Sequence, residues 1–392
     1  MRNISLFFAL CYAAFALDRS HLSEEIQSAI AHKEASIEAG RKRLKYDFLG
    51  EARLSGSITQ NKGVGATDWE KNEQASANFS QDIFRSGGIS ASMRHAEYWA
   101  QAERIRVAEE INGYLRQLAT LILQARQDQI RLRQNDLGIK NAEIALLIKQ
   151  RQYEVGEADI TQLNDALQTK NNLQKTRLEL KSQYLTRLDE IAKLSPLEPE
   201  SIPLAPFAPI TRAEYEARSL AMRLAKAQSM IAKEQHSITT SSYLPTLSAS
   251  AGISHTRSDM IDGESYNYGV TLSMPLSFTE GWAIEEKKLE SLRANSQERA
   301  TAQEVRRTYA QSLNAIDAIE GNIEVSRQNI TLYDSLIAVA NAQVNSGDRS
   351  RYDLQTLENS RQSDLLEIEL SNIAIQIELA KLHYAIDKET TQ

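Results

Sequence analysis

The chain has 392 residues and a formal net charge of −7, with charged residues at 25% and aromatic residues at only 6%. Glycine (16) and proline (7) are sparse, and the helix-favouring residues Ala, Leu, Glu, Gln, Lys and Arg are abundant. Nucleic-acid-binding proteins usually carry a basic surface, so the net negative charge argues against that function. These values predict an elongated, mainly helical protein rather than a set of compact globular domains.

The N-terminus predicts a secretory signal peptide over residues 1–16. Arg2 precedes an apolar run from Ile4 that ends in Ala14-Phe15-Ala16, a small-x-small pattern that favours cleavage after Ala16. A membrane anchor is the alternative, but the run is too short to span a bilayer as a helix. Lipidation of Cys11 is a second alternative, although the preceding residues make no convincing lipoprotein box. Since Cys11 is the only cysteine, the mature chain would have neither a disulfide nor a catalytic thiol.

Residues 17–194 form the first of two predicted repeats. A proline-free stretch over 89–153 carries apolar residues at three- and four-residue spacing, which predicts one continuous helix. Such a helix would be roughly 95–100 Å long, a length typical of coiled coils and tubes. The remaining elements predicted in this repeat are helix 22–48, strands 50–60 and 73–84, and helix 158–193.

A proline-rich linker over 195–211 follows the first repeat. It holds five of the seven prolines, and a helix cannot continue through them. The second repeat, 212–388, has the same pattern: helix 212–240, strands 245–256 and 266–278, long helix 283–346, and helix 349–387. Corresponding glycines mark both repeats, Gly88 with Gly281 and Gly156 with Gly347, at an offset of about 190 residues. In the simplest packing, two short helices stack end to end beside each long one.

Each predicted strand alternates apolar and polar residues, as Leu54 and Ser55 illustrate. The strands have about ten residues, the length that a tilted strand needs to cross a bilayer. No segment has the ~20 apolar residues of a membrane-spanning helix, so a membrane crossing would use strands. Four strands cannot close a barrel, and an open edge in lipid is costly, so this interpretation requires an oligomer. A soluble hairpin packed on the helices is the alternative.

In order and spacing, these features resemble the TolC-like outer membrane efflux protein family over roughly residues 20–388. The resemblance rests on the two repeats and on motifs at the strand entry, the strand-to-helix junction and the two helix reversals. These motifs are Leu244-Pro245-Thr246-Leu247-Ser248, Pro275 to Gly281, Tyr153-Glu154-Val155-Gly156 and Val344-Asn345-Ser346-Gly347. The implied fold is mainly α with a β-barrel part. In a homotrimer, a 12-stranded transmembrane barrel, with four strands per chain, would continue into a long α-helical periplasmic tunnel.

The resemblance also implies a function in the outer membrane. The chain would be the exit duct of a tripartite efflux or type I secretion system, conducting substrate passively out of the cell. Its partners would be outer membrane lipid, a periplasmic adaptor (membrane fusion) protein and an inner-membrane pump. The alternative from another class is a soluble periplasmic coiled-coil adaptor or scaffold. The substrate stays open between a drug, a metal ion, a peptide and a protein.

The family's periplasmic gate maps onto four positions of this chain. Arg349 and Asp353 match family gating residues, and three copies of Asp353 would form an acidic ring that favours cations. Gln162 and Thr356 stand where the family has aspartates, so the salt bridge of a closed tip is in doubt. The alternative for Arg349 and Asp353 is a solvated helix start, where an acidic residue is stabilised.

The family's adaptor-docking motif maps onto the two reversals. Val155, Gly156 and Glu157 fit the first-repeat motif. The second reversal has Ser346, Gly347 and Asp348, with serine where the family usually has valine. Both segments are therefore candidates for the contact with an adaptor.

Chemistry-bearing patterns are otherwise missing from the sequence. The six histidines lie on different segments without metal-ligand spacing. Gly87-Gly88 is predicted to be a turn and not a phosphate-binding loop, and no nucleophile elbow occurs. The sequence therefore predicts no enzymatic activity, no cofactor and no metal site.

Overall fold

The computed structural model describes the chain except for residues 1–16, 65–67, 200, 202–203, 259–260 and 388–392. The predicted signal peptide and Cys11 lie outside the described residues, so cleavage after Ala16 stays a prediction. No helix within the described part is apolar enough over a sufficient length to cross a membrane.

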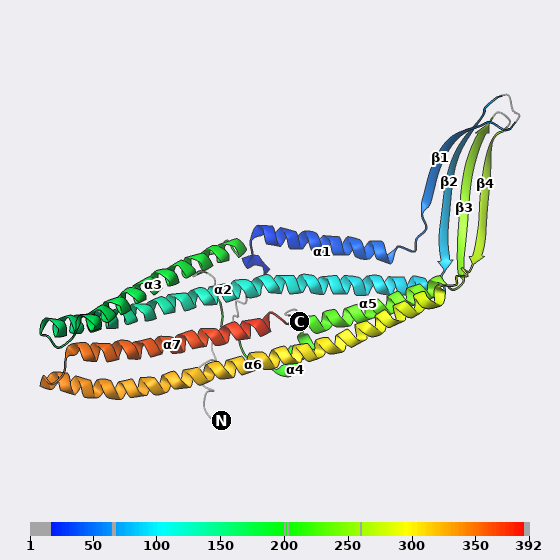
Figure 1. The fold of residues 1–392 in the computed structure, drawn as a ribbon. Coiled ribbons are helices and arrows are strands. Elements are labelled where there is room, and N and C mark those ends of the chain that lie inside the picture. Colours follow the sequence, from blue (N-terminus) through cyan, green and yellow to red (C-terminus); the bar gives the residue numbers. More distant parts are fainter. Residues whose placement is uncertain (1–16, 65–67, 200, 202–203, 259–260, 388–392) are drawn as a thin grey trace. The chain divides into compact units, whose positions relative to one another are not determined.

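The first repeat runs from a short 3₁₀ helix to the end of α3 (Figure 1). The chain enters the long helix through a tight turn, where Ser86 and Gly87 have φ values of 45° and 89°. This helix then continues for 67 residues, since no proline interrupts its backbone hydrogen bonds. The elements are η1 (Arg19–His21), α1 (Glu24–Lys45), β1 (Ala52–Asn61), β2 (Glu70–Phe84), α2 (Gly88–Glu154) and α3 (Ile160–Leu194).

The second repeat has the same order of long elements, and its long helix also has 67 residues. Its elements are α4 (Arg212–Arg218), α5 (Leu220–Ser242), β3 (Thr246–Ser258), β4 (Asp262–Ser273), α6 (Glu280–Ser346) and α7 (Arg351–His383). The two repeats therefore place a strand pair and a pair of longer helices in the same sequence order.

The prediction of one helix over 212–240 was wrong, because the chain leaves the helical conformation at Ser219. Ser219 has a ψ of 122° and forms an isolated β-bridge with Ile386. The neighbouring Arg218 carbonyl accepts a hydrogen bond from the Asp387 backbone N–H at 2.9 Å. The C-terminal segment thus pairs with the backbone at this point, which divides the predicted helix into α4 and α5.

The prediction of a strand over 266–278 was wrong at both ends. The strand β4 begins at Asp262, because Asp262 already pairs with Arg257 of β3. It ends at Ser273, two residues before Pro275, which has no backbone N–H to donate to a ladder. The strand is therefore shifted toward the β3–β4 turn.

The chain forms two compact units, each of which is described by itself. Unit 1 comprises Met1–Ile30, Glu109–Ser219 and Val305–Gln392, and unit 2 comprises Ala31–Ala108 and Leu220–Glu304. Because α2 and α6 contribute residues to both, each unit contains segments of both repeats.

In unit 1, four helices lie side by side in the order α3, α2, α7, α6 (Figure 1). The two middle helices share a core in which Ile130 of α2 packs with Leu366 and Leu370 of α7. Polar contacts join each adjacent pair: Arg177 with Asp136 at 2.6 Å, Asn359 with Asn141 at 2.7 Å, and Arg361 with Asp334 at 2.5 Å. The first and last helices, α3 and α6, are the outer members of this layer.

In unit 2, the helical order is α1, α2, α5, α6. Ala102 and Ile105 of α2 pack with Leu220 and Ala227 of α5 in a small core. Polar contacts again join adjacent helices: Arg41 with Glu97 at 2.8 Å, Arg94 with Glu234 at 2.8 Å, and Ser229 with Asn295 at 2.6 Å. Both units therefore contain a layer of four long helical segments, two from each repeat.

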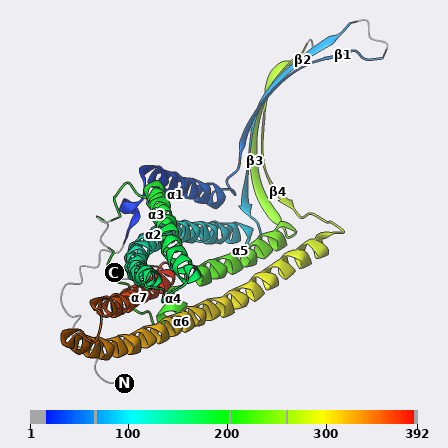
Figure 2. The ribbon, with the colours of Figure 1, turned by 60° about the vertical axis from the view of Figure 1, so that its left-hand side comes forward.

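Unit 2 also carries one antiparallel sheet in the order β1-β2-β3-β4 (Figures 1 and 2). The strands pair in sequence order across the linker between the repeats, since β2 of the first repeat pairs with β3 of the second. A register shift between Asp82 and Phe84 marks a bulge near the base of β2. The edges of the sheet are β1 and β4.

Candidate functional site

The two helix reversals of unit 1 have the same backbone structure. Gly156 and Gly347 have φ values of 78° and 85°, a region that residues with a Cβ rarely adopt. After each glycine, the next backbone N–H bonds a carbonyl five residues back: Glu157 to Gln152 at 2.7 Å and Asp348 to Gln343 at 2.9 Å. This is the Schellman pattern of a helix end.

Each returning helix begins three residues after its glycine with a capping side chain. The Asp159 carboxylate accepts a hydrogen bond from the Gln162 N–H at 2.8 Å. The Ser350 hydroxyl accepts one from the Tyr352 N–H at 3.2 Å. Each cap satisfies a backbone donor at the helix start, so the glycine and the cap together fix the reversal.

Of the four predicted gate residues, the structure brings Arg349 and Asp353 together. The Arg349 Nε lies 3.4 Å from Asp353 Oδ2, and a second guanidinium nitrogen lies 3.3 Å from Gln343 Oε1. Both charged side chains are more than a third exposed. An exposed ion pair of this kind contributes less than about 1 kcal/mol. Because both side chains are exposed, both groups are accessible to other partners.

Neither of the other two predicted gate residues hydrogen-bonds to that pair within the described residues. Gln162 is exposed in the first turn of α3, and no hydrogen bond joins its side chain to Arg349 or Asp353 within the described residues. The Thr356 hydroxyl donates to the Tyr352 carbonyl at 2.9 Å within α7. A single chain thus contains no salt bridge between the two reversals at these positions.

The predicted docking residues are accessible on both reversals. Val155 is 70% exposed, and Gly156 and Glu157 beside it are exposed. In the second reversal the Ser346 hydroxyl donates to Asp348 Oδ2 at 2.6 Å, so a polar contact occupies the position where the first reversal presents Val155. The two tips therefore offer different surfaces.

The pKa values of two carboxyl groups on the helices are shifted in opposite directions. Burial raises the pKa of Asp364 on α7, and nearby Glu367 acts in the same direction, against a hydrogen bond with Asn329. On α1, hydrogen bonding to Arg41 lowers the pKa of Glu38 to about 2. The surroundings of Asp364 thus disfavour its ionised form, whereas those of Glu38 stabilise its ionised form.

The sheet register separates polar from apolar side chains across all four strands. One row consists of Ser55, Ser76, Ser254 and Ser265, with hydroxyl contacts of 2.7 Å from Ser55 to Ser76 and from Ser254 to Ser265. The adjacent row toward the helices is Arg53, Asn78, Gly252 and Asn267. Side chains in these rows point to the same face, because alternate residues of paired strands share a face.

The opposite face of the sheet is apolar and uncovered. One of its rows contains Leu54, Ala77, Ile253 and Tyr266, and the next contains Ala52, Phe79, Ala251 and Tyr268. Leu54 is 81% exposed and Tyr268 is 90% exposed. An exposed apolar surface of this extent is typical of a membrane or protein contact.

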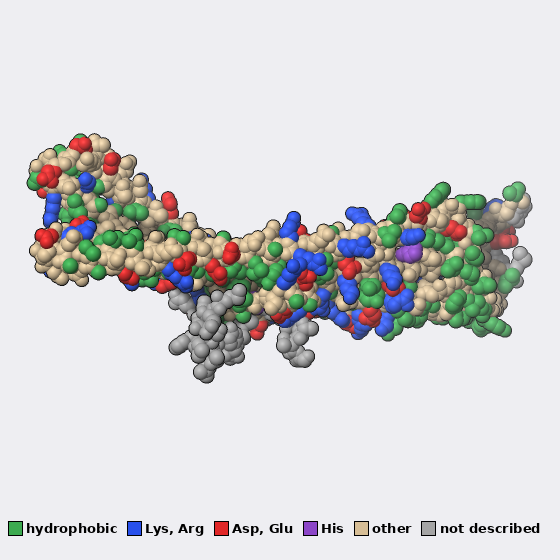
Figure 3. All heavy atoms as spheres, turned by 90° about the horizontal axis from the view of Figure 1, so that it is seen from below, with side chains coloured by type: hydrophobic (Ala, Val, Ile, Leu, Met, Phe, Trp, Pro, Cys, Tyr) green, Lys and Arg blue, Asp and Glu red, His purple; other side chains and the backbone are tan. Residues whose placement is uncertain are grey.

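Charged residues replace apolar ones toward the strand turns on this same face. His255 lies 3.4 Å from Asp262, and Arg257 lies 3.7 Å from the same carboxylate. At the other end, Phe278 and Trp282 are exposed where β4 leads into α6, and Figure 3 shows hydrophobic side chains gathered at the strand-bearing end of unit 2. An apolar band with aromatic residues at its rim is typical of a membrane-facing surface.

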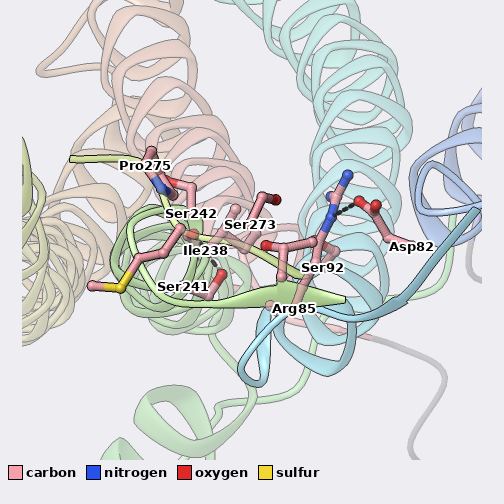
Figure 4. A pocket seen from close by; sticks show the side chains of 11 residues that line it. Asp82, Arg85, Ser92, Ile238, Ser241, Ser242, Ser273 and Pro275 are labelled. Carbon is pink, nitrogen blue, oxygen red and sulfur yellow. Dashed lines mark hydrogen bonds and ion pairs between the residues drawn. The ribbon is translucent and has the colours of Figure 1, made fainter. Parts of the chain in front are cut away.

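A cavity of about 600 Å³ lies in unit 2 between the base of the sheet and helices α2 and α5 (Figure 4). Asp82 and Arg85 form an ion pair of 2.5 Å in its wall. The neighbouring Gly88 approaches α5 so closely that a Cβ would lie 2.2 Å from the Ser241 hydroxyl oxygen. The cavity wall is otherwise rich in hydroxyl groups, including those of Ser92, Ser241, Ser242 and Ser273.

Sequence reasoning did not single out Arg53, Asp82 or Arg85 as functional residues. Alternation along β1 could assign Arg53 to the polar face, but only the register between strands shows which side chains lie beside it. For metals, no group of three or more His, Cys, Asp or Glu residues suited to an ion occurs in the described ranges.

Comparison with known proteins is consistent with these features. A model of the outer membrane efflux protein family matches residues 16–195 and 212–383, two segments that correspond to the two repeats. No curated protein sequence gave a match.

Solved structures with a similar fold cover almost the whole chain. The outer membrane protein VceC from Vibrio cholerae has 13% identity and a TM-score of 0.75 over 93% of each chain. The CmeC outer membrane channel of Campylobacter jejuni has 13% identity and a TM-score of 0.73, over 92% of this chain and 83% of CmeC. The open state of the MtrE outer membrane channel of Neisseria gonorrhoeae has 10% identity and a TM-score of 0.71, over 93% and 87%. The predicted fold class, mainly helical with a β part in two repeats, is confirmed.

Proposed function

Because the chain belongs to the outer membrane efflux protein family, we propose that three copies form one duct that conducts substrates passively out of the cell. Members of this family lie in the outer membrane and extend into the periplasm, and this chain does so too. The trimer, the conducting path and the partners are what we propose here.

The four-stranded sheet is the observation that best supports this proposal. It has four strands with open edges at β1 and β4, one apolar face and one polar face. An open strand edge in lipid leaves backbone groups without partners, which only closure of the sheet can satisfy. Three copies, with β4 of one beside β1 of the next, would close a 12-stranded barrel with its apolar face toward lipid and its polar face around water.

The outer helices of unit 1 support lateral contact between copies. On α3, Leu167, Leu178 and Leu185 are exposed, at spacings of seven and eleven residues that keep them on one side of the helix. On α6, Leu332 and Leu336 are exposed in the same way. As α3 and α6 are the two outer helices of their layer, contact between neighbouring copies would bury both stripes and continue the barrel as a helical tunnel.

The reversals would be the periplasmic tip of the tunnel. The proposed gate consists of Arg349 and Asp353, with Gln162 and Thr356 at the positions that lack an aspartate. The proposed adaptor contact consists of the exposed tips around Gly156 and Gly347. An inner-membrane pump would supply the energy, since the duct itself has no predicted cofactor.

Fractionation and conductance measurements test this function. The full-length protein, expressed with its own N-terminus, should appear in the outer membrane fraction and be extracted in mild detergent with the mass of three chains. The purified complex should form open channels in planar bilayers. A monomer released with the soluble periplasmic proteins would instead support the adaptor or scaffold alternative.

A further inference from the structure

Arg53, the second residue of the edge strand β1, is a charged residue on the polar face of the sheet. It pairs with Asn78 of β2, which pairs with Gly252 of β3, which pairs with Asn267 of β4. Arg53 is exposed, and it makes no ion pair with any residue in the described part of the chain. Its guanidinium is therefore available to a solute on that face.

The two asparagines in this row converge over Gly252. A Cβ at this position would lie 2.4 Å from the Oδ1 atoms of both Asn78 and Asn267, so the glycine makes room for the two amides. Asn78 also donates to the Ser76 hydroxyl at 3.3 Å. The row thus presents a guanidinium beside two uncharged side-chain amides, whose oxygens meet over Gly252.

No other uncompensated charge lies at this depth of the polar face among the described strand residues. Asp82, nearer the helices, forms its ion pair with Arg85 at 2.5 Å. Glu70 lies at the far end of β2, paired with Asn61 at the end of β1. The rows between Arg53 and those ends contain hydroxyl, amide and glycine residues.

We propose that Arg53 makes the barrel part of the duct favour anions, such as solutes with a carboxylate, sulfonate or phosphate group, and so opposes the cation preference of the Asp353 ring at the periplasmic tip. This inference rests on the proposed trimer, in which three copies of Arg53 lie at the same depth and form a positive ring. A guanidinium recognises such oxyanions through paired N–H donors. The neighbouring amides carry no charge, so they leave the charge of the guanidinium uncompensated.

The reversal potential in a KCl gradient measures this selectivity. The wild-type channel should favour Cl⁻ over K⁺ relative to Arg53→Gln, by about twofold or more in the permeability ratio at low salt. Arg53→Glu should shift the ratio further toward K⁺, and Arg53→Lys should retain most of the anion preference. Raising the salt to 1 M should shrink the differences, since the Debye length falls to about 3 Å.

Arg257 supplies a matched control on the same sheet. It lies on the opposite, apolar face of β3, beside Asp262, so Arg257→Gln removes the same charge outside the lumen and should leave the permeability ratio unchanged. Each variant is first checked for a detergent-stable trimer, and Arg53→Glu replaces Arg53→Gln if the latter fails to assemble. Equal ratios for wild type and Arg53→Gln, in channels that conduct, overturn the anion ring alone. Trimers of the wild type that never conduct overturn the duct itself.

Discussion

Gly156 and Gly347, 191 positions apart in the chain, hold the same left-handed backbone conformation, with φ values of 78° and 85°. Each follows one long helix, and three residues later Asp159 or Ser350 caps the start of the next helix. The same reversal thus occurs once in each repeat, and it is fixed locally by the glycine and by the capping side chain that follows it.

Gly156→Ala and Gly347→Ala should each destabilise the protein by about 1 kcal/mol, because alanine is strained at positive φ. Thermal unfolding of the detergent-solubilised protein measures this loss. Gly113→Ala is the matched control: Gly113 lies within α2 and a Cβ there would meet nothing within 4 Å. In a helix interior that change should stabilise by about 0.5–1 kcal/mol. If Gly113→Ala lowered the stability as much as the two reversal variants do, positive φ would not explain the effect at Gly156 and Gly347.

Arg187→Leu should destabilise unit 1 by about 3 kcal/mol, because removing one partner leaves a buried charge poorly compensated. Asp128 of α2 is fully buried and forms an ion pair with Arg187 of α3, with Arg131 at 3.7 Å. The free energy of unfolding in denaturant measures the effect. Combining Arg187→Leu with Asp128→Leu should recover much of the loss, as an apolar pair needs no compensation.

Arg177→Leu is the control for that prediction, since Arg177 makes the same kind of α3–α2 ion pair at an exposed position. Its contact with Asp136 has both side chains about half exposed, so its loss should cost less than about 1 kcal/mol. Equal costs for Arg177→Leu and Arg187→Leu would show that burial of Asp128 is not what makes its ion pair important.

Asp364→Asn should raise the melting temperature at pH 7 by about 1–3 °C. Burial raises the pKa of Asp364 above its ordinary 3.8, so the folded state disfavours the ionised carboxylate. The cost is present when the group is ionised and disappears as pH falls below 3.8, where both states bind the proton. The advantage of the variant should therefore vanish at low pH. Asp165→Asn, at an exposed position on α3, should show little change at either pH.

Arg349→Ser combined with Asp353→Ser should raise single-channel conductance in planar bilayers, because both charged groups would leave the proposed constriction. Their contact is exposed and local, between the reversal and the first turn of α7, so the double variant should still assemble. Glu324→Ser combined with Arg327→Ser removes a similarly exposed pair from the middle of α6 and should leave conductance unchanged. If the conductance of Arg349→Ser with Asp353→Ser were unaltered, Asp353 would not lie at the constriction.

Local patterns in the sequence predict the faces of the strands but not their partners. Alternation assigns Leu54 and Ser55 to opposite faces, since side-chain direction is a property of one strand. The row from Arg53 to Asn267 depends on the register, which the turns and the bulge near Asp82 set. The sequence alone therefore assigns Arg53 to the polar face, but it does not predict that Asn78 and Asn267 lie in the same row.

Helix packing was predictable within each repeat but not between repeats. Matched lengths predict that shorter helices lie beside each long one, and Arg177 with Asp136 joins such a pair. The contact of Asn141 with Asn359 links helices of different repeats, and helical periodicity gives a face without naming its partner. The break at Ser219 likewise depends on a distant segment, near Ile386.

Thiol labelling along β4 in intact cells tests the central claim, that the sheet is part of the wall of a water-filled membrane channel. Cys11 is the only native cysteine and lies in the predicted signal peptide, so each variant would carry one introduced thiol. Asn267→Cys and Ser265→Cys, on the polar face, should react with a charged, membrane-impermeant reagent, whereas Tyr266→Cys and Tyr268→Cys should be protected by lipid. Equal reaction at all four positions would contradict the account, because both faces of the sheet would then meet water.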